Sequence, residues 1–79
     1  MQIQDLITID PEILGGQPVF KGTRVPVETL FDHLESGISL NDFLEDFPSV
    51  SKDQAITLLD VANKLLTSKN ASQFYEAVA

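Results

Sequence analysis

The sequence predicts a small, mostly α protein: a tri-helical helix-turn-helix-like bundle preceded by a short N-terminal β-hairpin arm. Its 79 residues allow one small domain and no second one. Residues 1–24 contain two short β-prone runs around a glycine pair, whereas apolar side chains recur at helical spacing in three stretches of residues 25–66. We therefore expect a single arm-plus-three-helix domain over residues 1–66, followed by a short C-terminal tail over residues 67–79.

The arm is predicted from two extended runs. Residues 6–9 are β-prone and are followed by Asp10 and Pro11, a pair that initiates turns. Residues 18–21 form the second run, which Gly22 closes. A two-stranded hairpin is marginal by itself, so this arm must lie on the rest of the protein or on a second copy.

The first two helices are predicted from apolar spacing and from their boundary residues. The first starts at Pro26, a residue suited to an initial helical turn, and ends before Gly37, which favours the left-handed position after a helix. Ser39 is placed to cap the second, and Pro48 breaks it. Their apolar positions follow i, i+3, i+4 and i+7, and are Val27, Leu30, Phe31 and Leu34 in the first helix and Leu40, Phe43, Leu44 and Phe47 in the second.

The third helix, over residues 51–66, is predicted to be the longest. Ser51 and Gln54 have the spacing of a capping box, which marks its start. Its apolar coat is wider than one stripe, which indicates burial on two sides, the second against another copy of the chain. The residues expected at this homodimer interface are Ile56, Val61 and Leu65.

Composition limits both stability and function. The chain has no cysteine, so disulfides and thiolate metal sites are excluded, and oligomerisation is the remaining way to reinforce a thin core. Twelve acidic residues against five basic ones give a net charge of −7, and the helical stretch, with eight acids against two lysines, carries −6 of it (2 − 8). That balance opposes non-specific binding to nucleic acid or to anionic membranes. With no apolar run long enough to cross a bilayer and no signal-peptide pattern, we expect a soluble, cytoplasmic protein that does not bind membranes.

In a helix-turn-helix reading, the helix after the tight turn would enter the DNA major groove with its N-terminal residues. The candidate DNA-binding residues on that helix are Ser51, Lys52, Gln54 and Thr57. The competing interpretation is structural, because the capping box already uses two of them and Asp53 adds repulsion in the same turn. Lys21 and Arg24 are further candidates for a DNA phosphate or an acidic partner surface; alternatively, Arg24 pairs with an acid of the first helix or caps a loop.

No enzyme signature is present, and we expect no catalytic residue, metal or cofactor. His33 is the single histidine and lacks partners at metal-site or acid–base spacing, so we interpret it as a partly exposed helical side chain. The glycines lack the spacing of a phosphate loop. In the tail, an apolar turn could dock on a protein partner or could be a frayed terminus; its residues are Phe74, Tyr75 and Val78.

Residues 9–27 read IDPEILGGQPVFKGTRVPV. This string resembles the signature of the bacterial family known as domain of unknown function 433, and the resemblance extends over roughly residues 5–66. Members of that family are similar to helix-turn-helix proteins with a β arm, and many are described as antitoxin-like partners of a PIN-like ribonuclease toxin. The resemblance implies a dimeric, non-enzymatic antitoxin-like protein that binds such a toxin and its own promoter DNA. The alternative is a dimeric protein-interaction module with no DNA-binding role.

Overall fold

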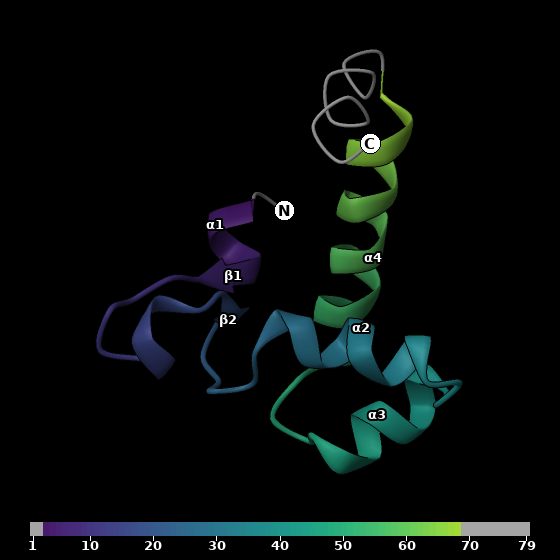
Figure 1. The fold of residues 1–79 in the computed structure, drawn as a ribbon, viewed down its shortest axis with the longest axis horizontal. Helices are drawn as coiled ribbons and strands as arrows, with labels where there is room; N and C mark the ends of the chain where they lie inside the picture. Colours follow the sequence, from purple (N-terminus) through teal and green to yellow (C-terminus); the bar gives the residue numbers. More distant parts are fainter. Residues whose placement is uncertain (1–2, 69–79) are drawn as a thin grey trace.

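The structure is a computed structural model that describes residues 3–68. Over that part of the chain it is mostly helical, with four α-helices, one 3₁₀ turn and a two-stranded antiparallel sheet (Figure 1). In chain order the elements are α1 (Ile3–Leu6), β1 (Ile7–Thr8), η1 (Leu14–Gly16), β2 (Val19–Phe20), α2 (Val27–Glu35), α3 (Leu40–Asp46) and α4 (Lys52–Thr67). Within residues 3–68, none of the helices combines the length and apolar character needed to span a bilayer.

The arm contains the predicted pair of short strands. β1 and β2 are antiparallel, with Ile7 opposite Phe20 and Thr8 opposite Val19. The prediction that the first extended run begins at Leu6 is wrong, because Leu6 ends the helical turn α1. That turn places the Leu6 side chain fully inside the core, while the Leu6 carbonyl accepts a hydrogen bond from the Lys21 amide at 2.9 Å. Leu6 thereby ties the start of the chain to the end of the second strand.

A tight turn connects the arm to α2. Gly22 has a φ of +79°, a left-handed conformation that glycine adopts without steric cost. Thr23 closes the turn: its amide and its hydroxyl both donate to the Phe20 carbonyl, at 3.0 and 2.8 Å, and its hydroxyl accepts from the Val25 amide at 3.0 Å. The Gly-Thr part of the Gly-Thr-Arg sequence therefore fixes backbone geometry.

The boundaries of α2 and α3 agree with the sequence signals. Pro26 is the residue before α2, and Gly37, at φ +83°, follows its end. The amides of Ile38 and Gly37 donate to His33 and Leu34 carbonyls at 2.9 and 3.0 Å, the bond pattern of a Schellman motif. Ser39 then caps α3 by accepting from the Asp42 amide at 3.1 Å.

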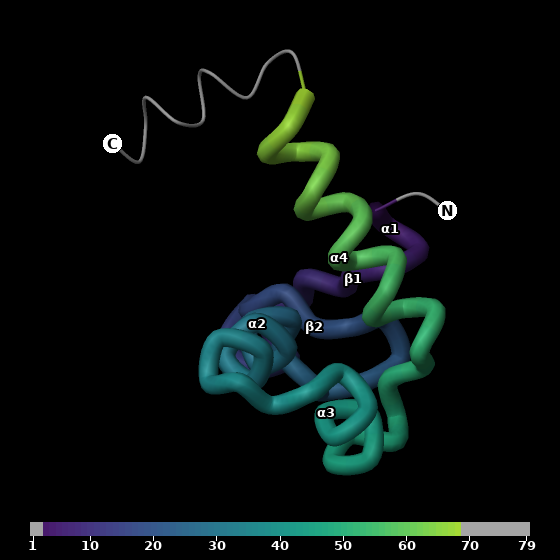
Figure 2. The backbone as a smooth tube through the Cα atoms, turned by 90° about the vertical axis from the view of Figure 1, so that its right-hand side faces the viewer, coloured from purple at the N-terminus to yellow at the C-terminus, as the bar shows by residue number. Residues whose placement is uncertain are grey.

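Helix α4 begins with the predicted capping box and continues to Thr67. Its first turns pack on the rest of the chain, and α1 lies beside it. Figures 1 and 2 both show its last turns extending beyond α2, α3 and the sheet. The helix is therefore embedded at one end and projecting at the other.

The core joins the arm to all three longer helices. Phe43 of α3 is fully buried, with its ring centroid 6.3 Å from that of Phe20 and 5.0 Å from that of Phe47. Burying an aromatic side chain removes much apolar surface from water, so this cluster is a main source of stability. The buried core residues are Leu6, Phe20, Val25, Leu30, Phe43, Val50, Ala55 and Leu58.

Candidate functional site

Two of the predicted DNA-contacting side chains hold the start of α4. The Gln54 amide donates to the Ser51 hydroxyl at 3.0 Å, and the Ser51 amide donates to the Gln54 side-chain oxygen at 2.9 Å. The side-chain nitrogen of Gln54 also donates to the Lys21 carbonyl at 3.0 Å, across 33 residues of chain. Gln54 therefore anchors the α4 N-terminus to the arm, a role that the i, i+3 spacing predicted only in part.

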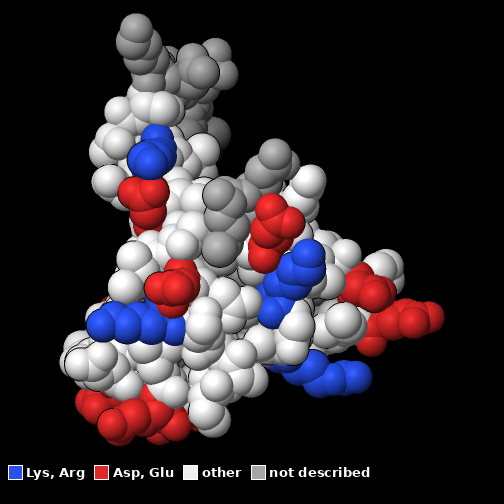
Figure 3. Space-filling model, turned by 180° about the vertical axis from the view of Figure 1, so that it is seen from behind, with Lys and Arg blue, Asp and Glu red and all other residues white. Residues whose placement is uncertain are grey.

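The basic candidates are exposed, on a surface that also carries acidic side chains. Lys21, Arg24 and Lys52 are all exposed, and within residues 3–68 no carboxylate lies within 4.0 Å of any of them. Figure 3 shows the basic side chains of one face separated by acidic and uncharged ones. Thr57, the remaining candidate, is half-buried. Each cation is free to reach a phosphate, but the acidic side chains among the basic ones of that face weaken the positive field that tracks a nucleic-acid backbone.

Arg24 borders a shallow hollow of about 570 Å³ where the arm meets the α3–α4 connection. The internal pairing of Arg24 with an acid of α2 is absent, since no carboxylate of residues 3–68 lies within 4.0 Å of it. The residues that line the hollow are Thr8, Ile13, Gly22, Thr23, Arg24 and Ser49.

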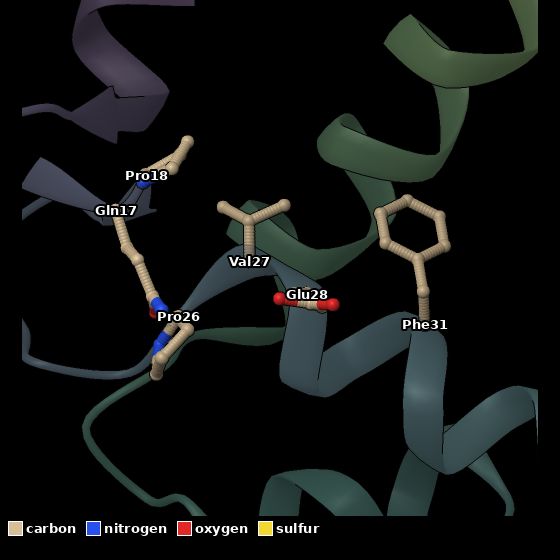
Figure 4. A pocket seen from close by; sticks show the side chains of 6 residues that line it. All are labelled: Gln17, Pro18, Pro26, Val27, Glu28 and Phe31. Atoms are coloured by element: carbon tan, nitrogen blue, oxygen red, sulfur yellow. The ribbon is translucent and has the colours of Figure 1, made fainter.

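A second hollow is smaller and mostly apolar. It has a volume of about 270 Å³ and lies between the arm and the start of α2. Figure 4 shows Gln17 and Pro18 on one side and Phe31 on the other, with Val27 and Glu28 between them. The Val27 amide donates to the Pro18 carbonyl at 2.9 Å, so the two walls are joined through their backbones.

This apolar pocket was not predicted from the sequence. In the sequence, Pro18 begins the second extended run and Pro26 begins the first helix, and they are eight positions apart. The pairing between Val19 and Pro26 brings both prolines to the same side of the arm. Glu28 stands at the rim with its carboxylate exposed, and within residues 3–68 no cationic nitrogen lies within 4.0 Å of it. The pocket therefore suits an apolar side chain with a basic neighbour.

The His33 side chain packs on aromatic rings and is hydrogen-bonded to the backbone. Its ring lies edge-on to the rings of Phe43 and Phe47, with both centroid distances at 5.4 Å, and its Nδ1 is hydrogen-bonded to the Thr29 carbonyl at 2.9 Å. Its Nε2 is 3.9 Å from a carboxylate oxygen of Asp46. In the described part of the chain, no three His, Cys, Asp or Glu side chains gather as a metal site would require.

The residues expected at a dimer interface differ in environment. Val61 packs against the core cluster, whereas Ile56 and Leu65 are 45% and 56% exposed. Ile56 and Leu65 are nine positions apart, which corresponds to opposite sides of an α-helix. These three residues therefore do not share one face. The tail candidates Phe74, Tyr75 and Val78 lie outside the described residues.

The fold of this chain is similar to that of a protein whose crystal structure is known. The structure is similar to the crystal structure of a DUF433 member protein from Anabaena variabilis, with a TM-score of 0.66 and 24% sequence identity. The match covers 96% of this chain and 70% of the other. At that identity the likeness establishes a shared mostly helical fold.

The chain belongs to the family described as protein of unknown function (DUF433), whose model matches residues 7–61. It is also 39% identical over 51 residues to the uncharacterized protein y4eO of Sinorhizobium fredii (strain NBRC 101917 / NGR234). That match covers 65% of this chain and 23% of the relative, so the chain corresponds to about a quarter of the longer protein.

Proposed function

We propose that this protein is a non-enzymatic, antitoxin-like protein that binds a PIN-like ribonuclease toxin. The apolar pocket between the arm and α2 is the observation that carries this proposal, together with Glu28 at its rim, whose carboxylate has no cationic nitrogen of residues 3–68 within 4.0 Å. The toxin class comes from the resemblance of residues 9–27 to the family signature. The net charge also supports a protein partner, because a chain of net charge −7 attracts a basic protein and repels nucleic acid.

Binding at this site would combine two contacts. An apolar toxin side chain would enter between the prolines and the Phe31 ring, where its removal from water supplies affinity. A neighbouring lysine or arginine of the toxin would pair with Glu28, which orients the complex and rejects acidic partners. The hydrogen bond that joins the two walls, from the Val27 amide to the Pro18 carbonyl, favours such binding because it holds the pocket together before association.

The test is to coexpress the chain with the product of its neighbouring gene and to measure the affinity of the purified complex by calorimetry. Glu28→Lys should weaken binding by about tenfold or more, because it places two cations at one contact. Glu45→Lys is the matched control, since it makes the same charge change at an exposed position of α3 away from the pocket. Equal losses in both variants, or no complex with the wild-type chain, would contradict the proposal.

Promoter DNA is a second candidate ligand, supported by the exposed cations Lys21, Arg24 and Lys52, which have no carboxylate within 4.0 Å in the described part of the chain. Fluorescence anisotropy on the DNA upstream of the gene, against a scrambled duplex and across a salt series, measures this activity. Sequence-dependent binding with a steep salt slope, weakened by Lys52→Glu, would support a repressor. Absence of binding at high micromolar protein would instead favour the alternative, a dimeric protein-interaction module with no DNA-binding role.

A further inference from the structure

Helix α4 continues one apolar stripe past the end of the domain that covers it. Leu58 is 4% exposed in the core, and Leu65, two turns later and within about 20° of the same direction, is 56% exposed. Ala55 and Ala62 repeat the pattern one turn earlier, the first fully buried and the second half-buried. The face that packs on the core in the first half of α4 is therefore the face that projects in the second half.

We infer that this projecting half of α4 pairs with the same half of a second copy of the chain. The two helices run antiparallel about a two-fold axis near Leu65, and each covers the other's apolar stripe. A half-buried alanine at position 62 lets the helix axes approach closely beside that contact. The interface is isologous, so a single exposed stripe is sufficient to complete itself.

The antiparallel arrangement follows from where the rest of the chain packs on α4. The rest of the chain lies on the stripe side of the first half of α4, where Ala55 and Leu58 are buried (Figure 2). Parallel helices joined through their second halves would place the two domains in the same space. An antiparallel pair instead places the two domains at opposite ends of the joined helices, where they do not overlap.

Charge selects a second copy over a basic partner as the occupant. Two copies of a −7 chain repel each other, and this repulsion opposes association least at a face that carries no net charge. The stripe is uncharged: Asp60 and Lys64 lie away from it and pair with each other at 2.9 Å. A basic toxin would gain no electrostatic attraction on this face, in contrast to the Glu28 pocket.

One helical stripe supplies only part of the roughly 800 Å² per copy that a stable dimer buries. Helix α1 packs beside α4, and its Ile3 side chain is 52% exposed. We therefore place α1 at the flank of the same interface. In this arrangement the partner's projecting helix contacts both α4 and α1 of the first copy.

Light scattering on the full chain tests the inference independently of any toxin. The wild-type protein should have twice the 8.7 kDa mass of one chain at micromolar concentration. Leu65→Glu should raise the dimer dissociation constant by roughly thirtyfold or more, the effect of losing a central contact. Ile56→Glu is the matched control on the opposite side of the same helix, with 45% exposure, and should leave the mass unchanged.

Cross-linking provides a second readout that does not depend on a charged substitution. Because the natural chain has no cysteine, Leu65→Cys and Ile56→Cys each introduce a single thiol. Oxidation should join two copies through position 65 and leave the position-56 variant as single chains. A monomeric wild-type chain, a dimer that survives Leu65→Glu, or equal cross-linking at both positions would overturn the inference.

Discussion

The two halves of α4 have similar apolar patterns and different surroundings. In the first half, Ala55 and Leu58 are buried against the arm, α2 and α3. In the second half, Leu65 continues the same face into solvent. The first half is thus explained by the fold of one chain, whereas the second half needs another surface to account for its composition.

This difference shows that the polar residues at the start of α4 and the most exposed apolar residue of that helix have separate roles. Ser51 and Gln54 are candidates for contacts in the DNA major groove, yet their hydrogen bonds cap the N-terminus of α4 and hold it to the arm. Leu65 has no special chemistry, yet it is the residue of α4 whose exposure is hardest to explain in a monomer. Function is therefore better sought at the second half of α4 and at the pocket beside α2.

The largest expected effect on stability is that of truncating Leu58 in the first half of α4, compared with truncating the matched Leu65 in the second half. Leu58→Ala should lower the free energy of unfolding by about 2–5 kcal/mol, because it leaves a cavity in the core. Leu65→Ala, measured by urea unfolding at concentrations where the chain is monomeric, should cost less than about 1 kcal/mol. Similar costs for both variants would show that the projecting half is covered within one chain.

A smaller effect is expected from the hydrogen bonds at the helix start. Ser51→Ala removes the cap and should destabilise the protein by about 1 kcal/mol. Gln54→Glu keeps the capping-box acceptor but loses the donor to the Lys21 carbonyl, so it should cost about 0.5–1.5 kcal/mol. Thermal unfolding of both variants checks these values. An unchanged midpoint for Gln54→Glu would mean that the anchor to the arm contributes nothing.

The smallest expected effect on stability is that of Lys52→Glu. Lys52 is exposed and has no carboxylate within 4.0 Å in the described chain, so its free energy of unfolding should change by no more than about 0.5 kcal/mol. The variant therefore tests the proposed DNA contact without a large change in stability. A larger loss of stability in urea unfolding would indicate that Lys52 has a structural partner.

Much of the fold was predictable because local signals decide helix boundaries. Gly37, Ser39 and the Ser51–Gln54 pair each act within a few residues, and all three end or begin helices as expected. The α1 turn was missed because four residues are too few to establish a helical period, and the burial of Leu6 depends on distant contacts.

The candidate sites were less predictable because they depend on which segments meet in space. The pocket requires Pro18 and Pro26 to be paired across the arm, and the anchor requires Gln54 to reach the Lys21 carbonyl. The helical period alone could place Ile56 and Leu65 on different faces, but it could not say which face the domain covers. That information comes from the packing of α4 against the core.

Amide hydrogen exchange along α4, measured at high and low protein concentration, tests the contrast between the two halves most directly. In dilute solution, residues 62–67 should exchange much faster than residues 55–58, because the projecting turns open locally while the embedded turns do not. Raising the concentration should narrow this gap, since a second copy then covers the projecting half. A gap that stays the same at both concentrations would contradict the account.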